Sequence, residues 1–144
     1  MKIKIFNILN IKIYLLFSFN TQAKDASNVW NNAYKSVVTI LPTWPGYDKP
    51  GFGAPTGTAP AGTGFYISIN DKKKTSNFIL TAAHVIQKSS SVKIKNYENK
   101  TENVEIIFKD TKRDIAILRT KTKGLSIKVS MGQTIIGNKV CVIG

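Results

Sequence analysis

Histidine and cysteine are nearly absent from this 144-residue chain, which contains one residue of each type. Two such residues cannot supply the four ligands of a structural zinc site, and no acidic loop suggests calcium. The single cysteine, Cys141, also excludes an intrachain disulfide. It lies in an apolar run, so we expect a small buried side chain, and it lacks the glycine-rich loop that a cysteine nucleophile needs. We therefore expect no metal and no other cofactor.

Acidic residues are scarce as well, since eight Asp and Glu stand against 21 Lys and Arg, for a net charge of +13. A basic chain can bind nucleic acid or an anionic membrane surface. The lysines are spread along the chain, however, and their densest run, residues 72–74, lies between two apolar strand-like runs. This placement is typical of a solvated hairpin tip. No nucleic-acid-binding motif accompanies it, so we expect no nucleic-acid partner.

No uninterrupted apolar run is long enough to cross a bilayer. Residues 1–23 instead have the pattern of a secretory signal, with a basic start at Lys2 and Lys4, an apolar core at 13–19 and a small residue, Ala23, at the expected cut. We predict cleavage after Ala23, no stable membrane anchor thereafter, and a mature domain at 24–144. An uncleaved amphipathic anchor is the alternative.

Proline is confined to one segment, residues 42–62, which is also rich in glycine. All five prolines lie there: Pro42, Pro45, Pro50, Pro55 and Pro60. Such a segment is predicted to be a long loop without regular structure. Trp44, Tyr47 and Phe52 within it favour docking against another surface, and a tolerated insertion is the other interpretation.

The rest of the chain has the pattern of a β protein. A short helix is predicted from Asp25, because Val29, Ala33 and Val37 share one face, and the β-branched run at 36–41 predicts a strand. Further short apolar or alternating runs are separated by turn signals at intervals of about 8–12 residues. They lie at 64–69, 77–81, 92–95, 104–108, 115–119, 125–129 and 139–143. Together they predict an all-β barrel or sandwich.

Three stretches in this pattern carry chemistry. The chain's one histidine, His84, lies in residues 81–85 (TAAHV), which follow the apolar run at 78–80. Histidine is the side-chain type whose unperturbed pKa lies nearest neutral pH, so it is the natural general base if the protein transfers protons. Residues 62–66 (GTGFY) lie upstream, and residues 114–118 (DIAIL) begin thirty residues after the histidine.

In order, spacing and residue type, these stretches resemble the first half of trypsin-like serine proteases, most closely those of the bacterial HtrA/Deg branch. The resemblance covers roughly residues 26–144. It implies the N-terminal six-stranded Greek-key barrel of the chymotrypsin-like double-barrel fold, with a short N-terminal helix. It also implies that His84 is the general base and that Asp114 orients it. Asp110 is the nearest rival carboxylate, but it precedes a polar turn and is expected to be exposed.

The nucleophile motif of that family, G-[ND]-S-G-G, is absent, and none of the ten serines has the required glycines beside it. In the family, the nucleophile, the oxyanion hole and the specificity pocket belong to the second barrel. We therefore expect the chain to carry half of an active site. It is then the N-terminal part of a longer endopeptidase, an inactive relative that binds peptides or proteins, or an unrelated secreted β-barrel binder.

The resemblance also implies partners and a location. We expect protein or peptide substrates, and the family allows a homo-oligomer. The predicted signal and the bacterial branch together indicate a periplasmic or secreted protein. The loop at 42–62 corresponds to a variable loop that in HtrA-like proteases takes part in assembly or regulation.

Overall fold

The computed structural model describes residues 26–47, 59–68, 74–130, 132–133, 135–138 and 140–143. The predicted signal segment and most of the predicted loop at 42–62 lie outside these residues. The chain divides into two units, residues 1–32 and 33–144, and each is considered by itself. Residues 26–33 form the predicted helix. No helix in the described part of the chain is long and apolar enough to cross a membrane.

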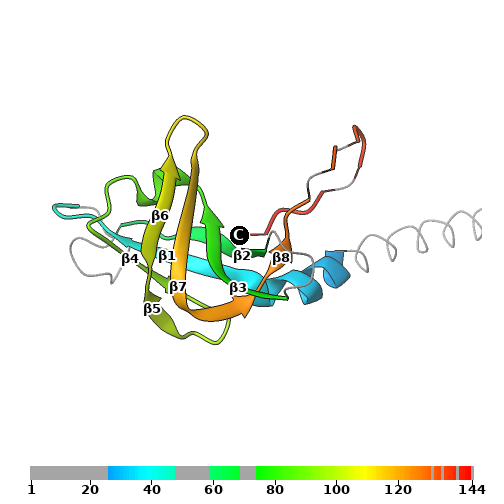
Figure 1. The fold of residues 1–144 in the computed structure, drawn as a ribbon, viewed down its shortest axis with the longest axis horizontal. Helices are drawn as coiled ribbons and strands as arrows, with labels where there is room; N and C mark the ends of the chain where they lie inside the picture. The colour runs from blue at the N-terminus through cyan, green and yellow to red at the C-terminus, as the bar shows by residue number, and fades with distance from the viewer. Residues whose placement is uncertain are drawn as a thin grey trace, which may run out of the picture. The chain divides into compact units, whose positions relative to one another are not determined.

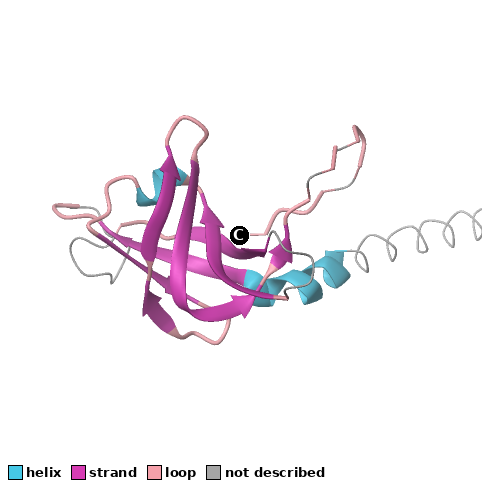
Figure 2. Ribbon diagram, viewed as in Figure 1, coloured by secondary structure: helices cyan, strands magenta, loops and turns pink. Residues whose placement is uncertain are grey.

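Strands dominate the second unit, as the sequence predicts (Figure 2). A 3₁₀ helix, η1 (Tyr34–Ser36), leads into the first strand, β1 (Val37–Thr43). The remaining elements are β2 (Gly62–Ser68), β3 (Thr75–Thr81), the 3₁₀ helix η2 (Ala83–Ile86), β4 (Ser91–Lys95), β5 (Thr101–Asn103), β6 (Glu105–Asp110), β7 (Ile115–Leu125) and β8 (Ile127–Lys128).

The strands form one sheet in the order β5-β4-β1-β2-β3-β7-β6, and neighbours along this path are antiparallel. Strand β8 lies off the path and pairs in parallel with β2. After β3 the chain crosses over through η2, so that β4 pairs with β1 and not with β3 (Figure 1). This crossover gives the sheet its Greek-key connection.

Strands β5 and β6 are two halves of one bent strand. Val104 is the single residue between them, and its backbone N–H donates a hydrogen bond to the carbonyl oxygen of Val92 at 3.1 Å. The first half pairs with β4 and the second half pairs with β7. The path therefore closes into a ring of six strands, which confirms the predicted six-stranded Greek-key barrel.

The core fills the inside of this ring. Strand β1 alternates half-buried and buried residues, and β4 alternates exposed and buried ones, as a period of two requires. The fully buried aliphatic side chains include Ile40, Ile79, Ile94 and Leu118, one from each of four different strands. Ala83 and Ile86 of η2 belong to the same cluster, so the helical turn that carries His84 is packed on the core.

The predicted loop at 42–62 is shorter at both ends than its proline and glycine content indicates. Pro42 lies inside β1, where it is buried and opposite Val92 of β4. The carbonyl of Pro42 accepts a bond from the N–H of Ala59, on the side away from β4. Because a residue's N–H and C=O point to the same side of a strand, the N–H that proline lacks costs no bond to β4.

The C-terminal part departs from prediction more strongly. The strand predicted at 125–129 is broken at Ser126, where β7 ends and β8 begins. The strand predicted at 139–143 is wrong, because the described residues 140–143 have no regular structure. Val140 and Val142 are 78% and 96% exposed, and Cys141 is exposed where we expected burial. A strand forms only with a backbone partner, and this segment has none among the described strands.

Candidate active site

The turn that follows β3 holds His84 on the rim of the barrel. Ala82 is still extended, with φ −77° and ψ 139°, and the chain then enters η2. A 3₁₀ helix has three residues per turn, so residues 83 and 86 share a face. Both are 1% exposed, and this face packs on the core. His84 lies on another face, which leaves its side chain 68% exposed.

Strand register brings Asp114 to the same place. Thr81, the last residue of β3, pairs with Ala116 of β7. The residues that follow β3 therefore lie beside those that precede β7, as the short helical turn near the end of the β6–β7 hairpin shows (Figure 2). Asp114 ends the turn between β6 and β7 with a φ of +56°, a left-handed conformation that aspartate tolerates better than most residues.

The two side chains are in direct contact. Nδ1 of His84 lies 2.7 Å from Oδ2 of Asp114, and the backbone N–H of His84 donates to Oδ1 at 2.8 Å. The ring hydrogen bond, and after it the backbone hydrogen bond, hold the pKa of the Asp114 carboxyl below its usual value, while burial acts in the opposite direction. An ionised carboxylate can only accept hydrogen bonds. Nδ1 must therefore be the donor, which leaves Nε2 of the neutral imidazole as an acceptor.

Asp110 forms hydrogen bonds within the turn between β6 and β7. One of its oxygens accepts the backbone N–H groups of Lys112 and Arg113 at 2.9 and 3.0 Å, and the other accepts the guanidinium of Arg113 at 2.7 Å. The backbone bond from Arg113, followed by its guanidinium, lowers the pKa of Asp110. Asp110 thus closes the turn that places Asp114. The expectation that Asp110 is exposed is wrong, since its side chain is 16% exposed, against 50% for Asp114. Asp at the start of a polar turn commonly bonds the backbone in this way, which is the signal in the sequence that indicates this role.

The third stretch, residues 62–66 at the start of β2, contacts the turn that carries His84. The hydroxyl of Thr81 donates to the carbonyl of Thr63 at 2.8 Å and is part-buried. A Cβ atom on Gly62 would lie 2.5 Å from Cγ1 of Val85, so only glycine lets β2 approach η2 this closely. The sequence motif named these glycines, but it gave no sign that Val85 was the neighbour that requires one of them.

Several serines have local structural bonds that account for their hydroxyls. Ser76 Oγ accepts the N–H of Phe78, Ser89 Oγ accepts the indole N–H of Trp44, and Ser90 Oγ donates to the carbonyl of Thr43. Across the described ranges, no cluster of three or more His, Cys, Asp or Glu side chains could hold a metal ion.

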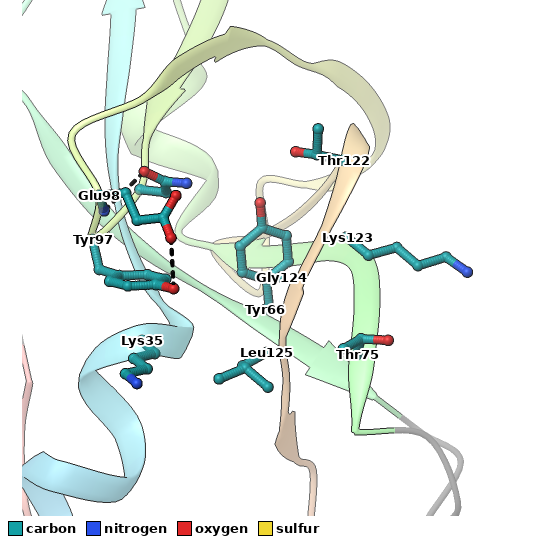
Figure 3. Close-up of a pocket in the computed structure, with 10 residues that line it drawn as sticks. Lys35, Tyr66, Thr75, Tyr97, Glu98, Thr122, Lys123, Gly124 and Leu125 are labelled. Atoms are coloured by element: carbon teal, nitrogen blue, oxygen red, sulfur yellow. Dashed lines mark hydrogen bonds between the residues drawn. The ribbon is translucent and has the colours of Figure 1, made fainter.

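A pocket of about 190 Å³ lies at the other end of the barrel (Figure 3). Its lining includes Thr75, the first residue of β3, and Leu125, the last residue of β7, whereas His84 and Asp114 adjoin the opposite ends of these strands. Tyr66 forms a wall, and burial raises the pKa of its hydroxyl. The carboxylate of Glu98, which also lines the pocket, accepts a hydrogen bond from the hydroxyl of Tyr97 and forms an ion pair with Lys100. The pocket is therefore separate from the His84–Asp114 pair.

Comparison with protein families matches residues 62–144, more than half of the chain, to the trypsin-like peptidase domain. Among solved structures, the chain is similar to the HtrA-type protease AlgW, in a complex with a tripeptide, with a TM-score of 0.55 and 16% identity over 75% of this chain. It is also similar to a serine endoprotease from Yersinia pestis, with a TM-score of 0.56 and 18% identity over 76% of this chain. The matched regions are 30% and 34% of those chains, so this chain spans about a third of their length. No curated protein sequence matches.

Proposed function

Because the chain belongs to the family of trypsin-like peptidase domains, we propose that His84 and Asp114 are the general base and the base-orienting acid of a serine-type endopeptidase. The observation that supports this role is the 2.7 Å contact between His84 Nδ1 and Asp114 Oδ2, with the second carboxylate oxygen held by the histidine's own backbone N–H. These two bonds fix both the ring and the tautomer that a general base needs.

In the proposed reaction, Nε2 of His84 takes the proton of a serine hydroxyl as the serine oxygen bonds to the scissile carbonyl carbon. The imidazolium that forms is stabilised by Asp114, which stays ionised because its pKa is lowered. His84 then returns the proton to the leaving amine as the C–N bond breaks. An imidazole that is 68% exposed is open to a nucleophile arriving from outside this barrel.

The serine itself is assigned to a second barrel outside these 144 residues. No serine of the chain lies in a glycine-rich nucleophile motif, and several are used in local hydrogen bonds. The oxyanion hole and the specificity pocket would come from the same second barrel. The chain on its own then supplies the base and its orienting acid and no peptidase activity.

The finer assignment is to the HtrA branch, with protein or peptide substrates. The similarity in fold to two HtrA-like proteases supports it, and so do the TAAHV and DIAIL stretches that carry the pair. We assign residues 1–23 to a cleaved signal, and the protein to the periplasm or the exterior of a bacterium. A homo-oligomer fits the same branch.

A second candidate is an inactive relative that binds peptides or proteins. It is favoured by the apolar side chains of β6 and the start of β7, since Ile106, Ile107, Phe108 and Ile115 are 37–49% exposed. Exposed apolar side chains on paired strands can mark an interaction surface. In that case the His84–Asp114 pair has no nucleophile to activate.

Hydrolysis of an unfolded, fluorescently labelled protein by the protein isolated from its native source distinguishes the two. An endopeptidase cleaves this substrate and reacts with a fluorophosphonate. His84→Ala should then lower kcat by a factor on the order of 10⁶, and Asp114→Asn by a factor of about 10⁴. Glu105→Gln is the matched control, since its ion pair with Arg119 lies on the surface, with the two side chains 61% and 48% exposed, and contributes little. Undiminished hydrolysis by His84→Ala would refute the assignment. Peptide binding by wild type without hydrolysis or labelling would establish the inactive relative.

A further inference from the structure

Residues 82–89, here called the histidine coil, carry His84 in a chain of short-range hydrogen bonds. The N–H of Val85 donates to Ala82 O at 3.3 Å, that of Gln87 to His84 O at 3.3 Å, and that of Ser89 to Ile86 O at 3.2 Å. Bonds of this i to i+3 type have poorer geometry than those of an α-helix and rarely continue beyond one turn. The position of the coil therefore depends on what holds it from outside.

The start and the middle of the histidine coil are held by the core and by β2. Ala83 and Ile86, each 1% exposed, pack in the core cluster. Thr81, just before it, is bonded through its hydroxyl to Thr63 O, and Val85 packs against Gly62. Both attachments come from β2. Asp114 adds the contact with His84 itself. None of these restrains the far end of the coil, where it turns toward β4.

The far end is held by residues that follow β1. The indole N–H of Trp44 donates to Ser89 Oγ at 3.2 Å in a part-buried bond. Next to it, the N–H and the hydroxyl of Ser90 both donate to Thr43 O, at 2.9 and 3.2 Å. Trp44, one of the three aromatic residues for which the sequence favours docking, thus bonds the histidine coil of its own chain.

Trp44 itself begins a turn that is closed by a hydrogen bond and a ring contact. Its carbonyl accepts the N–H of Tyr47 at 3.2 Å across a turn in which Gly46 has a φ of +74°. Proline at 45 followed by a glycine with positive φ is the arrangement of a type II turn. The rings of Trp44 and Tyr47 then meet edge to face, with centroids 5.4 Å apart. The indole N–H therefore has a fixed direction from which to bond Ser89.

We propose that Trp44 is a positioning residue for His84, because its bond to Ser89 fixes the far end of the histidine coil and so the place of the imidazole beside Asp114. The side chain of His84 is largely exposed, so the course of its backbone decides where the ring lies. The consequence for catalysis rests on the proposed function, whereas the consequence for the His84–Asp114 contact does not.

NMR on the chain as it stands tests the proposal without any activity. Trp44→Phe keeps an aromatic ring and removes the N–H, and Ser89→Ala removes the acceptor. Nitrogen-15 spectra report the ring of His84, which is the one histidine and needs no assignment, while carbon-13 titration reports the carboxyl of Asp114. Each variant is expected to change the His84 nitrogen shifts and to raise the pKa of Asp114 toward its usual value.

The double variant Trp44→Phe/Ser89→Ala should change these signals no further than either single variant, because both act through one bond. Ser76→Ala is the control, since it removes a similar serine bond, to the N–H of Phe78, near the end of β3 that lies away from the histidine coil. It should leave the His84 signals as in wild type. The proposal is overturned if the Trp44 and Ser89 variants lower the unfolding midpoint but leave His84 and Asp114 unchanged. It is also overturned if only one of the two single variants moves the signals.

In the protein that contains the nucleophile, a displaced base lowers kcat by about ten- to a hundredfold and leaves KM unchanged. A drop in both kcat and KM, or none in kcat, contradicts positioning. If His84→Ala retains full peptidase activity, the proposed function fails, but the NMR result still decides whether Trp44 places the ring.

Discussion

Gly62→Ala tests the close approach of β2 to the turn that carries His84. The added Cβ would lie 2.5 and 2.8 Å from the two γ carbons of Val85, against an ordinary carbon–carbon contact of about 3.5–4.0 Å. Val85 cannot escape easily, because a β-branched side chain has one strongly preferred rotamer and both of its γ carbons are involved. The turn must therefore move by about 1 Å, at a cost typical of overpacking, about 1–3 kcal/mol.

Urea unfolding measures this cost, and the His84 nitrogen shifts report whether the turn has moved. We expect a lower midpoint with an unchanged slope, and altered His84 signals. Gly132→Ala is the matched control, since its Cβ would meet only Ser130 Oγ at 3.6 Å, an ordinary contact. Adding Val85→Ala to Gly62→Ala removes the two closest atoms and leaves a contact of 3.2 Å with the Cβ atom of residue 85, so the His84 signals should return most of the way to those of wild type. If the unfolding midpoint and the His84 signals of Gly62→Ala are both the same as in wild type, the predicted clash with Val85 is contradicted.

Three further predictions follow from the same structure. Leu118 is 0% exposed, so Leu118→Ala should lower the free energy of unfolding, measured by urea denaturation, by about 2–5 kcal/mol. Ile136 is fully exposed, so Ile136→Ala should change the same quantity by less than about 0.5 kcal/mol. The folded-state pKa of Asp114 is depressed, so its contribution to stability is present above the unfolded pKa of about 3.9 and is lost as pH falls through the folded value. His84→Ala should therefore lower the free energy of unfolding at pH 7 and much less at pH 2. An equal loss at both pH values would contradict this. Cys141 should react with a thiol reagent in native buffer as fast as in denaturant, and slow native labelling would show that the thiol is covered.

Local patterns with a physical cause could be predicted from the sequence. The alternation at 92–95 and the apolar run before His84 indicate strands because each buries a defined face, and both strands are present as β4 and β3. The contact between His84 and Asp114 follows from the resemblance to a known family. Its geometric cause, the pairing of Thr81 with Ala116, could not be deduced, because register depends on partners far away in the sequence.

Other features depend on partners that composition does not reveal. Pro42 belongs to a strand because its missing N–H faces away from β4, and no local signal tells which side of a proline is paired. The alternating run at 139–143 resembles a strand, but a strand needs a neighbour, and Cys141 is exposed for the same reason. The sequence favours docking of Trp44 against another surface, but it does not indicate that Ser89 is the residue that Trp44 bonds.

The tautomer of His84 tests the central claim most directly. Nitrogen-15 NMR at a pH where the imidazole is neutral distinguishes a protonated Nδ1 from a protonated Nε2. We expect a proton on Nδ1 in wild type and in Glu105→Gln, and its loss from Nδ1 in Asp114→Asn. A proton on Nε2 in wild type, or one tautomer shared by wild type and Asp114→Asn, would contradict the assignment of His84 and Asp114 as base and orienting acid.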